Sequence, residues 1–494
     1  MSSRDRAARP RPSLRFRDRS VFDGVARREV GSADVLAHSV AVLVPSLTAL
    51  GTGLALPGMV GPGFWISTLL GFGLVWLLGS TFGEFASRFT SAGTLYTFVA
   101  KGFGPLPALV VGGALMIGYG AIIGFGLTDA SGRFDAAIDA GLPDTPGGGL
   151  RVATVFVACV LACLFAMRRG IQWTSRVVMA VEAVSLVVLA IVLWTWTTRY
   201  GLPSWTALSL DGASPTRILL GAAGVVTLTL AFESSASLAL ETKRPLHDVP
   251  WALRNSLLVA AGLFVLANLV ATTRPADAPS IWSWRWFAPG QATSVADALV
   301  LLVLATSLLA LAMCVWSALA RLLFSLAREG VLPSWLGRVD GHGVPFAAVL
   351  AVTPLALAVP VGAMVTGTDI GAFAWQLKQS GGVVICVAYA AAAFALPRFL
   401  WLIDEISWKP ALCAGAAGVG AVAVAVTQLV AELRDGTWLA LGLLAAAAGI
   451  GQLMQRRVRS AASLDELYVG MHDAAVASQV VLGPEPPHGA HADV

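Results

Sequence analysis

The chain has 494 residues, of which 56% are hydrophobic and 13% are charged, and its formal net charge is +4. A soluble globular protein carries about 25% charged residues, so this composition excludes a soluble enzyme, a disordered protein and a nucleic-acid binder as descriptions of the whole chain. Apolar segments recur along nearly the whole length. This recurrence excludes a single-pass receptor and leaves a polytopic membrane protein.

The chain begins with a polar, strongly basic stretch. Nine arginines precede residue 30. Next to a membrane span, such a stretch is typical of a cytoplasmic tail that faces anionic lipid. We therefore expect residues 1–33 to form a cytoplasmic N-terminal tail.

Twelve apolar segments follow, each close to the roughly 20 residues that cross a bilayer core as a helix. Their long runs of Ala, Leu, Val and Gly lack the short alternation of a membrane barrel, so we predict an all-α protein. The predicted spans are 34–58, 63–86, 105–129, 151–168, 174–197, 217–240, 251–273, 295–320, 345–365, 372–396, 410–431 and 436–455. Residues 456–494 are predicted to be a disordered cytoplasmic tail.

The basic residues indicate the orientation. With the N-terminus inside, 25 Lys and Arg fall on the inner side and seven on the outer side, and Lys378 lies within the tenth span. The positive-inside rule therefore predicts a multi-pass protein of the cytoplasmic membrane with both termini in the cytoplasm.

The first span has a sequence that is unsuited to a continuous helix. Residues 44–53 read VPSLTALGTG. Proline lacks an amide hydrogen, and glycine loosens the backbone. Two interpretations stay open: a proline kink, which is common in membrane helices, or a discontinuous helix whose free backbone groups bind a solute near the midplane.

The sixth span carries a carboxylate, Glu233, about halfway along the otherwise uncharged stretch 218–240. A charge at this depth costs about 3 kcal/mol on insertion scales, so it normally faces a cavity or a partner. The two serines after Glu233 are typical of a new helix start, where the helix dipole favours a carboxylate. The breaks in spans one and six lie five spans apart. This is the offset expected when two five-helix repeats each begin with a broken helix.

Three segments together resemble one family. They are GEFASRFTSAGTLY at 83–96, FE at 232–233 with ETKRP at 241–245, and RLLFSLAREGVLP at 321–333. In this order and spacing, residues 30 to about 400 resemble the amino acid–polyamine–organocation (APC) superfamily of secondary transporters.

The resemblance implies a leucine-transporter-like core of two inverted five-helix repeats, residues 34–400, followed by two further helices in 401–455. It also implies alternating access around a site between spans one, three, six, eight and ten. In the family, glycine-rich backbone of the first span receives the substrate carboxylate; here Pro45, Ser46 and Leu47 occupy that position, and Thr227 occupies the position of a common aromatic gate. The predicted solute-binding residues are Val44, Pro45, Ser46, Leu47, Thr48, Thr227, Leu230, Ala231 and Phe232.

Further residues are predicted to act in gating or coupling. These are Glu233, the i,i+4 pair of Glu84 and Arg88, and Glu182. Glu182 lies near Ser185, which occupies the position of a lysine that replaces sodium in some family members.

Thr306 and Ser307 resemble a pair that coordinates sodium in relatives with this fold. Oxygen ligands suit such a cation, although Ser and Thr also bond simply within membrane helices. Coupling to Na⁺ or H⁺ stays open. Lys378 either meets an anionic group or extends to the outer interface.

The sequence therefore predicts a secondary transporter for amino acids or related amines, acting as a monomer or homodimer in the lipid bilayer without a nucleic-acid partner. We expect no catalytic residue or prosthetic group, because the spans contain no catalytic or cofactor motif and the six histidines are scattered. We expect no metal, because the five cysteines lie in apolar stretches without metal-ligand spacing. The alternatives are an ion channel, for which no repeated filter motif appears, a membrane-embedded enzyme, and a permease for a non-amino-acid organic cation or a nucleobase.

Overall fold

The computed structural model describes residues 29–141, 149–273, 294–341 and 343–460. Within these ranges the regular structure is helical, apart from one isolated parallel bridge between Val30 and Thr242. Twelve segments of the described chain are long and apolar enough to cross a membrane. The prediction of an all-helical protein with twelve spans is thus confirmed, while most of the two predicted tails lies outside the described residues.

The helical elements follow one another along the whole described chain. They are α1 (Ser32–Leu43), α2 (Pro45–Thr48), η1 (Ala49–Gly53), α3 (Leu54–Val60), α4 (Phe64–Ala86), α5 (Leu95–Phe103), α6 (Pro105–Gly141), α7 (Gly149–Arg168), α8 (Ile171–Tyr200), η2 (Trp205–Leu208), α9 (Pro215–Leu228), η3 (Phe232–Leu238), α10 (Pro245–Ala271), α11 (Val295–Arg328), η6 (Ser334–Gly337), α12 (Phe346–Ala356), α13 (Ala358–Thr366), α14 (Ile370–Leu402), α15 (Trp408–Arg434) and α16 (Leu439–Ser460).

The third and eighth spans are longer than predicted. The predicted ends at 129 and 320 lie next to charged residues, whereas α6 and α11 continue to Gly141 and Arg328. The charges are accommodated within the helix, since Arg133 Nε lies 3.0 Å from Asp129 Oδ2 one turn away. Helix α5, between the second and third spans, was not predicted.

The first span is discontinuous rather than merely kinked. Helix α1 ends at Leu43, and Val44 adopts a left-handed backbone with φ of 41°, which is rare for a β-branched residue. Helix α2 then starts at Pro45, where a missing amide hydrogen costs no helical bond. The Thr48 hydroxyl donates to the carbonyls of Leu43 at 2.7 Å and Val44 at 2.5 Å, which stabilises the break.

The sixth span is broken as well. Helix α9 ends at Leu228, Ala231 has a left-handed φ of 68°, and a 3₁₀ helix, η3, begins at Phe232. The helix start predicted around Glu233 is therefore present, in the tighter 3₁₀ form.

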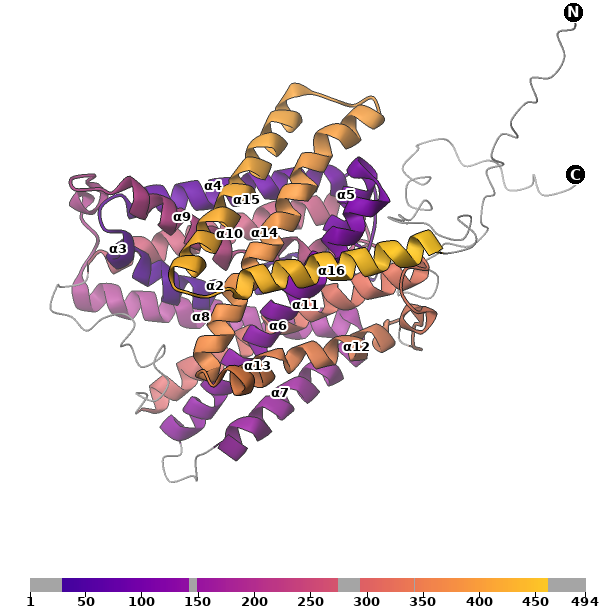
Figure 1. Cartoon of the computed structure of the whole chain (residues 1–494). Coiled ribbons are helices and arrows are strands. Elements are labelled where there is room, and N and C mark those ends of the chain that lie inside the picture. The colour runs from indigo at the N-terminus through magenta and orange to yellow at the C-terminus, as the bar shows by residue number, and fades with distance from the viewer. Residues whose placement is uncertain (1–28, 142–148, 274–293, 342, 461–494) are drawn as a thin grey trace, which may run out of the picture.

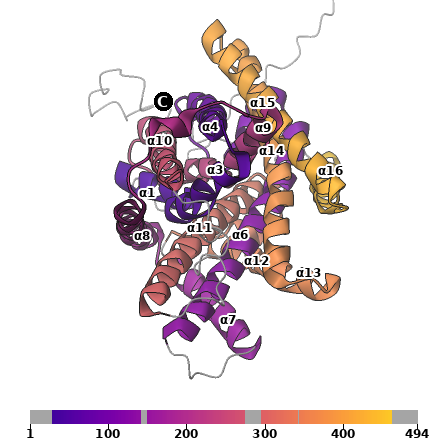
Figure 2. The same ribbon diagram turned by 90° about the vertical axis from the view of Figure 1, so that its left-hand side faces the viewer.

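The long helices α6 and α11 pack against each other in the middle of the bundle. Figure 2 shows them at the centre, with α1, α8 and α10 on one side and α14, α15 and α16 on the other. In Figure 1, α14 and α15 cross the other helices at a steep angle. Large exposed apolar side chains cover outer helices such as α7, α8 and α15, as lipid contact requires.

The twelve spans are even in number, so α1 begins and α16 ends at the same end of the bundle, here called the α1 face. The opposite end is called the far face. Odd-numbered spans, including the third (α6), therefore run from the α1 face to the far face. The sixth, eighth and tenth spans run in the opposite direction.

Candidate functional site

A cavity of about 210 Å³ lies beside the two broken helices. A single water needs only about 10–15 Å³ on a comparable measure, so the cavity has room for a small organic solute. Its walls come from the first, third, sixth, eighth and tenth spans, the five that the family resemblance implies.

The predicted solute-binding residues divide into two groups. Five of them line the cavity: Val44, Leu47, Thr48, Thr227 and Leu230. The other four are not part of its lining: Pro45, Ser46, Ala231 and Phe232.

The second group packs elsewhere around the breaks. The Ser46 hydroxyl is hydrogen-bonded to that of Ser185 on α8. The Phe232 ring is fully buried and stacks on Phe82, with centroids 5.9 Å apart. These residues therefore fix the broken segments against their neighbours.

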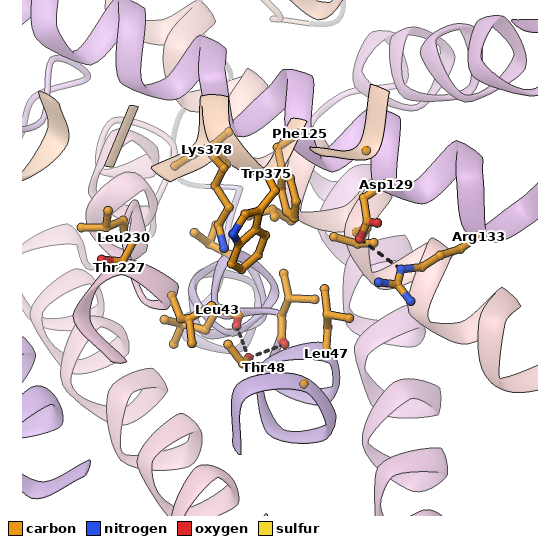
Figure 3. A pocket seen from close by; sticks show the side chains of 18 residues that line it. Leu43, Leu47, Thr48, Phe125, Asp129, Arg133, Thr227, Leu230, Trp375 and Lys378 are labelled. Atoms are coloured by element: carbon orange, nitrogen blue, oxygen red, sulfur yellow. Dashed lines mark hydrogen bonds and ion pairs between the residues drawn. The ribbon is translucent and has the colours of Figure 1, made fainter. Parts of the chain in front are cut away.

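Most of the charged residues in the cavity wall were not predicted from the sequence. Figure 3 shows Lys378 and Trp375 projecting from α14 toward the first-span break, with Asp129 and Arg133 paired at one side. The Lys378 Nζ lies 4.9 Å from the ring centroids of both Phe125 and Trp375. The spacing held a signal, since Phe125, Asp129 and Arg133 recur every four residues and share one helix face.

Glu233 is fully buried and joins three spans. Tyr119 of α6 donates to its Oε1 at 2.6 Å, and Tyr389 of α14 donates to its Oε2. The Tyr389 hydroxyl also accepts the amide hydrogen of Ala231 at 2.8 Å. Both tyrosines thus hold the carboxylate, and Tyr389 also holds the left-handed residue of the sixth-span break.

Glu182 and Ser307 meet between α8 and α11. The Ser307 hydroxyl donates to Glu182 Oε1 at 2.6 Å, while the buried Oε2 has no hydrogen-bond partner among the described residues. Thr306 is not brought to this point, because its hydroxyl donates to the Val303 carbonyl of its own helix at 2.9 Å. Within the described ranges, no group of three or more His, Cys, Asp or Glu side chains is placed to hold a metal ion.

Buried polar contacts close the bundle at the α1 face. Glu241, just after η3, accepts two hydrogen bonds from Arg321 of α11, both at 3.0 Å. Burial raises the pKa of Glu241 above its ordinary value, and the charge and hydrogen bonds of Arg321 oppose that rise. Nearby, the Tyr96 hydroxyl of α5 donates to Glu329 Oε2 at 2.5 Å.

The predicted pair of Glu84 and Arg88 is brought together at the same face. Arg88 Nη1 donates to Glu84 Oε2 at 2.6 Å, and its Nε donates to Glu405 Oε2 at 2.8 Å. Burial lowers the pKa of Arg88, but the bonds and charges of the two glutamates outweigh it, so the pKa lies above the ordinary value. Glu405, after α14, was not predicted as a third member.

The sequence matches the family model of amino acid permeases over residues 35–446. The chain belongs to the amino acid permease family. It is a secondary transporter for amino acids or related amines, as predicted from the sequence.

Two relatives of this amino acid permease are distant from it in sequence. It is 24% identical over 365 residues to the branched-chain amino acid permease BcaP of Bacillus subtilis. The aligned region covers 67% of this chain and 76% of that protein. The permease is 25% identical over 277 residues to cationic amino acid transporter 9, chloroplastic, of Arabidopsis thaliana, with 53% and 48% covered.

The permease also resembles a solved structure of a mutant manganese transporter from Eremococcus coleocola. The TM-score is 0.54 at 12% identity, with 88% of this chain and 98% of that chain covered. At this identity the likeness concerns the fold alone. It agrees with the leucine-transporter-like fold predicted from the sequence.

Proposed function

We propose that this permease moves an amino acid, chemically unchanged, across the cytoplasmic membrane by alternating access around the cavity, with both termini in the cytoplasm. The asymmetry of the molecule is the observation that supports this most. The cavity lies in the far-face half, while the α1 face is closed by buried polar contacts.

The directions of the helices indicate which half of the bundle contains the cavity. Helix α6 starts at the α1 face, and its lining residues run from Ile122, at the middle of the helix, to Arg133 in its second half. Helix α14 starts at the far face, and its lining residues, Gly371 to Lys378, lie within its first nine positions. In the proposed cycle, this arrangement is the state in which the solute site is separated from the α1 face.

The backbone indicates which segments move together. Val30, before α1, accepts the amide hydrogen of Lys243 at 2.9 Å and donates its own to Glu241 at 3.0 Å. These bonds tie the start of the first span to the end of the sixth. In the proposed mechanism the two pivot as one body about Val44 and Ala231, and the contact between Glu241 and Arg321 opens.

We further propose that transport is coupled to protons at Glu182. Burying an ionised carboxylate without a cation costs several kcal/mol, and the described surroundings of Glu182 provide one hydroxyl donor, from Ser307. A neutral, protonated carboxyl group fits this environment better than an ionised one. A sodium site at Thr306 and Ser307 is the competing proposal.

Counterflow in proteoliposomes tests the transport function. Vesicles preloaded with an unlabelled amino acid should accumulate the same labelled amino acid, whereas a channel gives no such accumulation. Uptake should respond to a pH gradient and not to sodium, and Glu182→Gln should remove the pH response while exchange continues. A dependence on sodium with no effect of pH would contradict proton coupling and favour the sodium site.

Cysteine labelling tests alternation itself. Ser237 is fully buried beside Glu241 and Arg321 on the α1 side. A cysteine there should react slowly with a thiol reagent at rest and faster during solute exchange. Ser407→Cys, on the exposed segment before α15, is the matched control that should react equally in both conditions. If exchange leaves the labelling of position 237 unchanged, this face does not open as proposed.

A further inference from the structure

Lys378 is an unusual residue to find in the wall of a membrane cavity. Its ammonium group rests between the Phe125 and Trp375 rings, 4.9 Å from each centroid. Among the described residues no carboxylate lies within ion-pair distance of it. The aromatic faces attract the cation, but its hydrogen-bond donors have no acceptor in the part of the chain that the structure describes.

The charges around the cavity favour an anion. Its lining holds two cations, Lys378 and Arg133, and one carboxylate, Asp129. Asp129 is already bound by Arg133, with 3.0 Å between Oδ2 and Nε. The formal charge of the wall is therefore +1, and it is concentrated on Lys378 among apolar side chains such as Leu230, where electrostatic attraction is strong.

Part of the first-span break is closed to a carboxylate. Pro45 has no amide hydrogen, and the Thr48 amide donates to the Val44 carbonyl at 2.9 Å. The Thr48 hydroxyl is directed to the Leu43 carbonyl at 2.7 Å, and the Ser46 hydroxyl is bonded to Ser185. Several polar groups expected to hold the solute are thus already engaged.

We propose that Lys378 binds the carboxylate of the solute, so that an anionic group on the solute is required for recognition. An ammonium offers three donors and a compact charge, and the rings of Phe125 and Trp375 hold it facing the cavity. The substrate class is then amino acids and other carboxylates, while amines that lack a carboxylate are excluded. This inference rests on the proposed function and narrows it.

The test compares each exchanged amino acid with its decarboxylation product. Amino acids that the wild-type protein exchanges are identified first by counterflow. Equilibrium binding of each labelled acid to purified protein is then measured with the matching amine as competitor, for example leucine with 3-methylbutylamine and lysine with cadaverine. The protein carries either Lys378, Lys378→Met or Lys378→Arg.

Lys409 offers a matched control. Its Nζ lies 5.6 Å from the centroid of the Trp408 ring, but it is exposed at the start of α15 and far from the cavity lining. Lys409→Met therefore also removes a lysine that lies over a tryptophan ring, but it leaves the cavity unchanged. Size-exclusion profiles and melting temperatures of all variants show whether each is folded.

We expect Lys378→Met to weaken amino acid binding by about 10- to 100-fold, the range of one charge-assisted hydrogen bond. Lys378→Arg should retain most of the affinity, Lys409→Met all of it, and the amines should fail to compete. If folded Lys378→Met binds within twofold of wild type, or the amines compete as well as the acids, the inference is wrong. Absence of exchange for every amino acid in the wild type would instead overturn the proposed function, and the inference with it.

Discussion

Replacing Glu233 by glutamine tests the role of the tyrosines that hold the sixth-span break. Glutamine keeps the size of the side chain but has one carbonyl oxygen, so it accepts from only one of the two tyrosine hydroxyls, Tyr119 or Tyr389. The lost interaction is a hydrogen bond to a charged group, which is worth roughly 1.5–3 kcal/mol.

If these bonds exist only while the α1 face is closed, their loss shifts the balance between the two states by the same energy. Because about 1.4 kcal/mol corresponds to a factor of ten, the shift is roughly 10- to 100-fold toward the state with the open α1 face. We expect Glu233→Gln to bind solute within a few fold of wild type while gradient-driven accumulation is lost.

The assay combines uptake into proteoliposomes, with and without an imposed ion gradient, and equilibrium binding. Glu432→Gln is the matched control, because Glu432 also accepts hydroxyl hydrogen bonds, from Ser380 at 2.9 and 3.0 Å, but lies on α15 outside the cavity lining. Tyr389→Phe should reproduce the Glu233→Gln defect, and the double variant should be little worse than either. Normal gradient-driven uptake in Glu233→Gln would refute the reasoning.

Three shorter predictions concern packing, the first break and topology. Gly113→Ala should destabilise the protein by about 1–3 kcal/mol, because a Cβ there meets a backbone carbonyl of α16. Gly132→Ala is the control and should not destabilise it, because open space surrounds that position. Equal melting temperatures of the two variants would contradict this prediction. Thr48→Val removes the hydroxyl donated to the break and should weaken solute affinity by about two- to tenfold, which saturation binding measures. Ser209→Cys should react with an impermeant thiol reagent on intact cells and Ser407→Cys only after permeabilisation; the reverse would contradict the proposed orientation.

The two helix breaks could be predicted because their causes are local. Proline removes an amide hydrogen from the first span, and Glu233 with its serines changes the helical preference of the sixth. The sequence window around each break indicates an irregular helix, although in the first span it left a proline kink and a discontinuous helix both open, and the left-handed backbone of Val44 and Ala231 was not predicted.

The partners of these breaks were not predicted, because they come from other spans. Tyr119 and Tyr389 are 270 residues apart in the chain, and neither has a neighbour that indicates a role. They meet at Glu233 only after α6, η3 and α14 have packed. For Lys378 the sequence left an anionic partner and the outer interface both open, and it did not predict the rings of Phe125 and Trp375, which come from two helices.

Thr306 and Ser307 show a different limit. Successive residues on an α-helix point about 100° apart, so two neighbours rarely face the same partner. Ser307 faces α8 and Glu182, while the Thr306 hydroxyl returns to its own backbone. A sequence pattern could indicate the pair but could not decide which member faces α8.

Helix α14 connects the cavity wall to the region near the α1 face. One unbroken helix carries Lys378 on the cavity wall, Tyr389 against the Glu233 carboxylate, and Ala395 where Gly102 of α5 packs closely near the α1 face. At about 1.5 Å per residue, Lys378 and Ala395 are about 25 Å apart along its axis. A helix resists bending over such a length, so a small tilt produced at one end appears at the other as a displacement. In the proposed mechanism, the α1 face could then respond to a solute in the cavity without a relay of side chains.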